Sequence, residues 1–343
     1  MARKNDEKLN YGAEIRSLKE NGPQRLYLLW GVEDYLREQY LAQLKTACLP
    51  EGEDSFSFKR MDGPDIDVNE LAQAVDAMPF LSDRSFVEIR GLDLNKLKDA
   101  DRLVAILSDI PDYCTVALVQ SAQFEPDGRL KAVKAIRALA RELKFTQQSQ
   151  GLLIDWIIRR FAAAGKGVEL DAVQRLIFVS GDLMNKLIPE IEKIAAYAKG
   201  ERITVADIDA VAEPVLDARI FDMTNAVTAR DYDRAAAILS ELLRMQTEPI
   251  VILAALGKEL RKLYTARMAL DTGKDRFWVK QLWNMGSDYP AKLLMQAAKK
   301  VDHDWCADAV KRCQMLDRRM KSERGIDSEA ELTLFLMELA GAR

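Results

Sequence analysis

A short apolar segment that runs through a single glycine into a helix constrains the fold of this chain more than any other feature. Residues 26–36 read LYLLWGVEDYL, which predicts a buried strand, a turn at Gly31 and the start of a helix. In nucleotide-binding folds built on a parallel sheet, the phosphate-binding loop lies at this place. The segment therefore predicts an α/β layer and raises the question of whether its loop can hold phosphate.

The loop lacks the groups that bind phosphate. The motif G-x-x-x-x-G-K-[ST] supplies glycines that let backbone N–H groups approach the phosphates, a lysine for their charge and a hydroxyl for magnesium. At the last three positions, counted from Gly31, this chain has Leu36, Arg37 and Glu38. Leu36 carries a Cβ where the loop needs none, and Glu38 places negative charge beside the expected phosphates. We therefore expect a nucleotide-binding fold that binds no nucleotide and uses no cofactor.

The remaining pattern predicts the fold class α/β plus all-α. Alternating segments favour a parallel sheet with crossover helices, with strands at 25–30, 55–60, 85–90, 115–120 and 143–146. From Gly151 onward glycines separate amphipathic helices, and we expect no further strand. The predicted domains are an α/β domain over residues 1–149, a small helical domain over 150–215 and a helical bundle over 216–343.

Composition favours a cytoplasmic protein without a metal site. The N-terminus is polar, and no apolar run is long enough to suggest a leader or a membrane span. The four cysteines have no C-x-x-C spacing, and His303 is the single histidine, so neither a metal centre nor a histidine-based catalytic triad is expected.

Charge is nearly balanced, with 50 basic against 54 acidic residues, but two runs concentrate positive charge. One run comprises Arg129, Lys131, Lys134, Arg137, Arg141 and Lys144. The other comprises Lys311, Arg312, Arg318, Arg319, Lys321 and Arg324. Each run fits a solvated helix face, and a DNA-binding scaffold that uses these helices remains an alternative.

Four segments resemble the delta-subunit family of bacterial DNA polymerase III, which belongs to the AAA+ clamp loaders. They read LYLLWGVEDYLREQYLAQLK, DAMPFLSDRSFVEIRGLD, SGDLMNKLIPEIEKIAAYAKGERIT and DMTNAVTARDYDRAAAILSELLRMQTEPIVILAALGKELRKLY. The resemblance implies a RecA-like AAA+ domain, a helical lid domain and a helical collar domain, in the order given above. It also implies that the chain is a subunit of a DNA-directed DNA polymerase holoenzyme, and that this subunit has no ATPase or nucleotidyltransferase site of its own.

Other departures from an AAA+ motor agree with this resemblance. The expected strand 85–90 ends in Arg90, where a motor offers acidic residues for magnesium. Met184 stands where a motor lid places an arginine against the γ-phosphate. An ATP-dependent switch of the same fold, with Arg37 in place of the lysine, remains a second alternative.

The turn between the helix that begins near Asp67 and strand 85–90 is the candidate binding surface. Pro79 stops the helix and holds the following residues extended, which projects Phe80 and Leu81. In the resembled family this segment forms a hydrophobic plug that enters a pocket of the sliding clamp. The resemblance thus assigns clamp binding to Phe80 and Leu81, with Met78 as a weaker neighbour. The alternative is that the two side chains seal the helix against its own sheet.

The resemblance also names the expected partners. They are the sliding clamp (beta), the motor subunits and delta-prime through the collar domain, and primer-template DNA inside the assembled complex. No contact with a membrane is expected.

Overall fold

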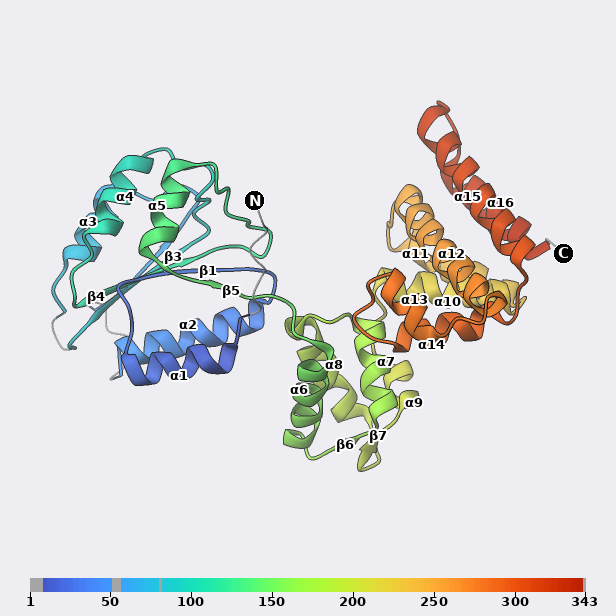
Figure 1. The fold of residues 1–343 in the computed structure, drawn as a ribbon, viewed down its shortest axis with the longest axis horizontal. Helices are drawn as coiled ribbons and strands as arrows, with labels where there is room; N and C mark the ends of the chain where they lie inside the picture. The colour runs from blue at the N-terminus through green and yellow to red at the C-terminus, as the bar shows by residue number, and fades with distance from the viewer. Residues whose placement is uncertain (1–8, 51–56, 80–81, 342–343) are drawn as a thin grey trace. The chain divides into compact units, whose positions relative to one another are not determined.

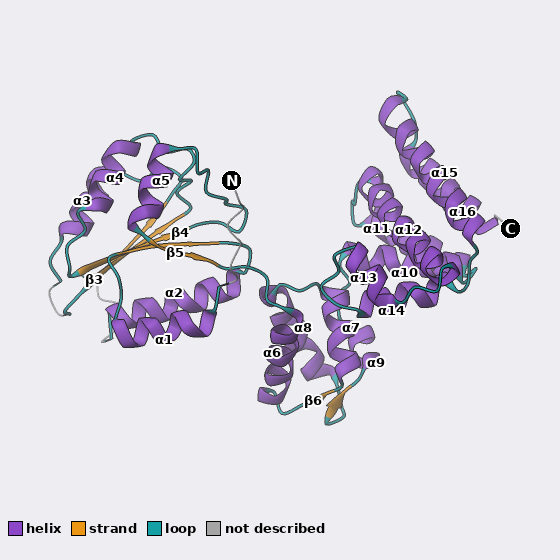
Figure 2. Cartoon of the chain, viewed as in Figure 1, coloured by secondary structure: helices purple, strands orange, loops and turns teal. Residues whose placement is uncertain are grey.

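The computed structural model describes residues 9–50, 57–79 and 82–341, which divide into two compact units. The first unit comprises Met1–Gln148 with Leu183–Asn185, and the second comprises Ser149–Asp182 with Lys186–Arg343. The first contains a five-stranded sheet, and the second is almost entirely helical (Figures 1 and 2). The division of the second unit into a lid and a collar domain stays a prediction.

The sheet of the first unit is fully parallel, which confirms the predicted α/β class. Its strands are β1 (Leu26–Trp30), β2 (Phe58–Asp62), β3 (Ser85–Arg90), β4 (Cys114–Val119) and β5 (Arg141–Lys144). They lie in the order β2-β3-β4-β1-β5. The fifth strand lies two residues earlier than predicted, because its pairing with Tyr27–Trp30 of β1 begins at Arg141.

Helices cover both faces of this sheet (Figure 1). One face carries α3 (Val68–Asp76), α4 (Ala100–Ser108) and α5 (Lys131–Leu139), and the other carries α1 (Tyr11–Asn21) and α2 (Asp34–Cys48). Leu28 belongs to the apolar core that the sheet forms with α3, α4 and α5. Tyr27 packs toward α2, where its ring centroid lies 6.2 Å from that of Tyr40. Because β1 is buried on both faces, it reads as the continuous apolar run seen in the sequence.

Gly31 joins β1 to α2 and cannot be replaced by a residue with a side chain without strain. Its φ is +118°, and an added Cβ would lie 2.3 Å from the carbonyl oxygen of Phe145. The backbone of Phe145 is held in place by two further hydrogen bonds. Its N–H donates to the Trp30 oxygen at 2.7 Å, and its oxygen accepts from the Glu33 N–H at 3.1 Å. The turn is therefore fastened to the segment that follows β5.

The second unit begins with a helical segment that also contains two short strands. Its elements are α6 (Gln150–Ala163), β6 (Gly167–Val168), α7 (Leu170–Ser180), α8 (Met184–Tyr197), β7 (Arg202–Ile203) and α9 (Val205–Val211). The expectation of no strand beyond Gly151 is therefore wrong, because β6 pairs in parallel with β7. Strands of two residues are too short to show the alternation by which a strand is recognised in a sequence.

In the described part of the second unit, seven further helices follow. They are α10 (Leu216–Thr228), α11 (Tyr232–Arg244), α12 (Pro249–Asp271), α13 (Arg276–Leu282), α14 (Tyr289–Ala298), α15 (His303–Ser322) and α16 (Ser328–Gly341). The long helix α12 lies in the core of this bundle, and Gly257 lets α15 approach it, since an added Cβ would lie 3.0 Å from the Cys313 sulfur.

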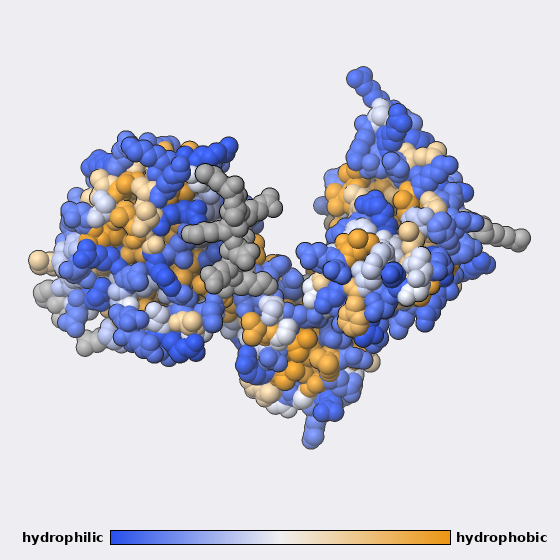
Figure 3. All heavy atoms as spheres, in the orientation of Figure 1, coloured by the Kyte–Doolittle hydropathy of each residue, from blue (hydrophilic) through white to orange (hydrophobic). Residues whose placement is uncertain are grey.

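Hydrophilic side chains cover most of the face drawn in Figure 3, with apolar side chains gathered in patches between them. Within the described ranges, no helix is both long and apolar enough to cross a membrane.

We predict that Gly31→Ala lowers the free energy of unfolding by about 2 kcal/mol or more, because the new methyl group meets the Phe145 carbonyl in a backbone conformation that alanine disfavours. Urea denaturation followed by circular dichroism measures the change. The matched control is Gly128→Ala, where φ is not positive and a Cβ meets nothing within 4 Å. For this control the free energy of unfolding should change by no more than about 0.5 kcal/mol. Equal effects of the two substitutions would show that the close contact of Gly31 with Phe145 does not constrain the turn.

Candidate functional site

Arg37, at the position of the phosphate-binding lysine, is bonded inside its own turn. The side chain is 6% exposed. Its Nη1 donates to the Gly31 carbonyl oxygen at 2.8 Å, and its Nη2 lies 2.5 Å from the Asp34 carboxylate. The guanidinium therefore satisfies a backbone carbonyl at the start of α2 and balances an acid of the first helical turn.

Glu38 forms an ion pair with Arg90, the residue that ends β3. Both carboxylate oxygens of Glu38 accept from the guanidinium, at 2.8 Å from Nη1 and 2.7 Å from Nη2. Arg90 also donates to the buried Glu88, whose carboxylate lies 3.2 Å from the ammonium of Lys45. Two acids and two bases thus form one connected network on β3 and α2.

The Glu38–Arg90 pair favours the charged forms of both its members. Partial burial opposes ionisation of Glu38, but the hydrogen bonds and the charge of Arg90 outweigh it, so the pKa of the carboxyl lies below its ordinary value. The same hydrogen bonds, which Arg90 donates to Glu38, raise the pKa of Arg90. The negative charge that the sequence placed beside the expected phosphates is thus matched by a cation within the protein.

Leu36 and Met184 are both buried, at 8% and 3% exposure. Met184 belongs to the short segment Leu183–Asn185 that groups with the first unit. Its backbone N–H lies 3.3 and 3.4 Å from the two carboxylate oxygens of Glu33, a side chain that is fully buried. The first backbone donor of α8 is therefore satisfied by an acid that the sequence analysis did not single out.

The five residues predicted to form the degenerate nucleotide site all lie in the first unit, and three of them, Gly31, Arg37 and Glu38, lie close together. Gly31 and Arg37 contact each other, Glu38 bonds to Arg90, and Met184 meets Glu33. The only sequence sign of the Glu38–Arg90 pair was that both positions departed from the motor pattern. The described residues contain no group of three or more His, Cys, Asp or Glu side chains that could hold a metal ion.

The candidate binding turn is anchored on both flanks. At its start the Tyr113 hydroxyl donates to the carbonyl of Asp76, the last residue of α3. At its end the Ser82 hydroxyl donates to the Ser57 hydroxyl at 2.7 Å and lies 2.8 Å from the Arg84 carbonyl oxygen. The helix ends before Pro79, since the next residue after Asp76 already has an extended backbone with ψ of 121°.

Met78 is 78% exposed and therefore projects from this anchored turn. Phe80 and Leu81, to which clamp binding was assigned, lie outside the described residues, so their assignment stays a prediction.

In each basic run, at least three of the six basic residues form ion pairs with acids of the same unit. In the first run the ion pairs are Arg129–Asp127, Arg137–Glu142 and Arg141–Glu14. In the second they are Arg312–Asp308, Arg319–Glu331 and Lys321–Asp317. This pairing favours a solvated surface over one that faces phosphates. The first run does not lie on one helix, since Arg141 and Lys144 belong to β5.

We predict that Glu38→Gln lowers the free energy of unfolding by about 0.5–1 kcal/mol at pH 7, because a half-exposed ion pair contributes no more than this. Since the folded pKa of Glu38 lies below its ordinary value, the contribution is fully present above about pH 5 and is lost as the pH falls through the lowered pKa.

Urea denaturation at several pH values between 7 and 3.5 tests this, with Glu20→Gln on the exposed side of α1 as control. A difference between Glu38→Gln and the natural chain that stays constant over this range would show that the charge of Glu38 does not stabilise the fold.

Comparison with known proteins places these features in a family. A model described as DNA polymerase III, delta subunit, matches residues 27–146, and a model described as DNA polymerase III delta subunit, C-terminal domain, matches residues 217–339. DNA polymerase III subunit delta of Bacillus subtilis (strain 168) is 21% identical over 334 residues, which cover 94% of this chain and 95% of that protein. The probable DNA polymerase III subunit delta of Aquifex aeolicus (strain VF5) is 22% identical over 265 residues, which cover 74% and 73%.

The solved structure of the Bacillus subtilis DNA clamp loader delta protein has the same fold. It superposes with a TM-score of 0.50 at 19% identity, over 97% of this chain and all of that one. The two family models together match more than half of the chain, one on each side of the segment that contains α6–α9. The chain therefore belongs to the delta-subunit family of DNA polymerase III.

Proposed function

We propose that this chain is a non-catalytic clamp-loader subunit that binds the sliding clamp through the turn at residues 77–82 and opens its ring for loading onto primed DNA. The observation that carries the proposal is the exposed Met78 on a turn whose two flanks are anchored by hydrogen bonds. An exposed apolar side chain beside an anchored helix end is suited to enter a pocket of another protein. The sequence places Phe80 and Leu81 directly after it.

The contact energy of such a turn is sufficient both to bind and to distort a ring. Burying two large apolar side chains contributes about 1.5–3 kcal/mol each. If the clamp pocket accepts them only when the neighbouring ring interface is strained, the same energy shifts the clamp population toward the open form. No chemical step by this chain is required.

The geometry of the first unit supports a subunit that does not use ATP. Arg37, the only candidate for the lysine role, already bonds to Gly31 and Asp34 and is nearly fully buried. An ATP-driven switch would have to break these bonds and the Glu38–Arg90 pair before phosphate could be held. The role of the chain in DNA replication would then come from its contacts alone.

Assembly supplies the remaining partners in this proposal. The helical bundle of residues 216–343 would act as the collar that joins the motor subunits and delta-prime in the cytoplasm. Primer-template DNA would be held by the assembled complex, and the ion-paired basic runs give this chain little affinity for DNA by itself.

We predict that Phe80→Ala and Leu81→Ala each weaken binding of the cognate sliding clamp about tenfold or more, because each removes a large part of an apolar anchor. Met78→Ala should have a smaller effect. Titration of labelled clamp with each variant measures the affinity, and Leu139→Ala, a 46% exposed leucine of the same unit, is the matched control. If Phe80→Ala and Leu81→Ala bind as tightly as the control, the turn is not the clamp-binding site.

A second measurement separates this proposal from an ATP-driven switch. Isothermal titration with Mg-ATP up to millimolar concentration should show no saturable binding to the isolated chain, while a motor subunit measured in parallel should bind. Micromolar binding that Arg37→Ala abolishes would favour the switch instead.

A further inference from the structure

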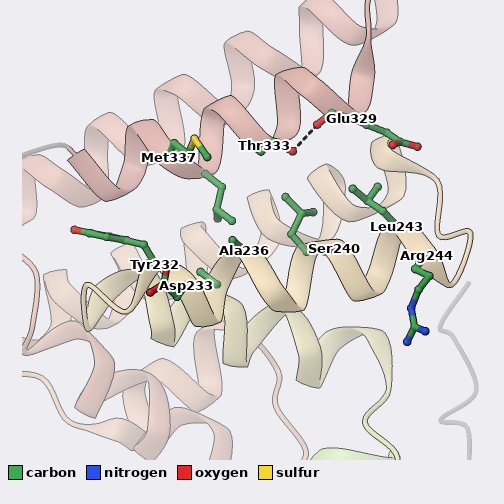
Figure 4. Close-up of a pocket in the computed structure, with 12 residues that line it drawn as sticks. Tyr232, Asp233, Ala236, Ser240, Leu243, Arg244, Glu329, Thr333 and Met337 are labelled. Carbon is green, nitrogen blue, oxygen red and sulfur yellow. Dashed lines mark hydrogen bonds between the residues drawn. The ribbon is translucent and has the colours of Figure 1, made fainter.

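A groove of the second unit lies between α11 and α16 and has no role in the site described above. Its volume is about 940 Å³. Figure 4 shows side chains of both helices facing each other across it, with Tyr232 and Asp233 toward one end and Leu243 and Arg244 toward the other.

The shape of the lining is suited to a helix. Small residues, Ala236 and Ser240 on α11 and Thr333 on α16, leave room along the groove, and the Thr333 hydroxyl is turned back to the Glu329 carbonyl at 2.8 Å. Larger apolar side chains flank them: Leu239, Leu243, Leu336 and Met337. Ala236 and Ser240 are four residues apart on α11, and Thr333 and Met337 are four residues apart on α16. Each wall therefore presents a row of side chains at i and i+4, and the side chains of another helix can pack between such rows.

Helix α16 has more apolar surface than its own bundle covers. Leu332, Phe335, Leu336 and Leu339 are buried in the core of the second unit. Leu334 and Met337, on other sides of the same helix, remain 52% and 62% exposed. Apolar side chains that a bundle leaves exposed beside a groove often mark a site of protein interaction. The exposed part therefore points to a protein partner.

Charge at the ends of the groove indicates the orientation of that partner. Asp233 lies in the first turn of α11 and Arg244 in its last turn, about 16 Å apart along the axis. Helices favour acidic residues in their first turn and basic residues in their last turn. A helix antiparallel to α11 would place its basic last turn beside Asp233 and its acidic first turn beside Arg244. Glu329 lies toward the Arg244 end and offsets the positive charge there. The Asp233 end therefore selects the charge of the partner helix more strongly.

We propose that this groove binds one amphipathic helix of another protein chain, antiparallel to α11, with apolar residues at i and i+4 and a basic residue in its last turn. The identity of that chain rests on the proposed function: it would be a neighbouring clamp-loader subunit. The groove would then be the part of the collar interface contributed by α11 and α16.

The test uses the full chain with purified motor subunits and delta-prime of the same bacterium. Ala236→Glu and Met337→Glu place a carboxylate among the apolar side chains of the groove, and both positions are exposed, so the fold should be retained. Each variant should weaken assembly at least tenfold, measured by titration and by native mass spectrometry. The matched control is Met315→Glu on α15, which is 58% exposed and lies outside the groove; it should assemble like the natural chain.

Two results would overturn the proposal. One is assembly of both groove variants with unchanged affinity. The other is self-association of the isolated chain that the groove variants abolish, which would assign the groove to a second copy. Capture of the sliding clamp, measured on the same samples, keeps the two proposals apart. The groove variants should bind the clamp as tightly as the natural chain does. If the natural chain does not bind the clamp at all, the proposed function is refuted, and the groove proposal still stands as long as assembly depends on the groove.

Discussion

The close approach of Gly31 to the Phe145 carbonyl is the constraint on which the first unit depends. No side chain fits at this point, and the backbone of Phe145 is bonded to both Trp30 and Glu33. The contact fixes where β1 ends, where α2 begins and how the segment after β5 runs past them. Arg37 then closes the turn by donating to the Gly31 carbonyl from the next turn of the helix. A loop that is held from both sides in this way has little freedom to wrap around a phosphate.

The losses that the sequence showed one by one are coupled in the structure. Glu38 in place of a hydroxyl and Arg90 in place of an acid each read as a missing catalytic group. Together they form a bidentate ion pair between residues 52 positions apart. Sequence spacing could show that both positions departed from the motor pattern, but only the fold brings α2 beside the end of β3. A carboxylate and a guanidinium that satisfy each other leave neither magnesium nor phosphate an unpaired partner at this point.

Long, strongly patterned elements could be predicted from the sequence, whereas short and long-range features could not. The strand 85–90 was placed correctly because its apolar residues Phe86, Val87 and Ile89 mark a segment that is buried on both sides. The strands Gly167–Val168 and Arg202–Ile203 were missed, since two residues carry no periodicity. Glu33 was missed for a different reason: its partner is the backbone of Met184, 151 residues away, and no side-chain pattern records a backbone donor. The roles of Phe80 and Leu81 rest on the sequence alone.

Strand β3 connects the two features that matter most in the first unit. Ser82, which anchors the candidate binding turn, lies just before its amino end, and Arg90 lies at its carboxyl end, roughly 17–20 Å away for a strand of six residues. The strand is paired on both sides, with β2 and β4, so neither end can shift without breaking ladder hydrogen bonds. If the turn binds the clamp as proposed, the flank at Ser82 is already held before binding, which leaves more of the contact energy to distort the partner. The ion pair at the far end adds to this rigidity, since it ties the same strand to α2. Under the proposed function, residues at positions that hold nucleotide in a motor would stiffen the support of the binding turn.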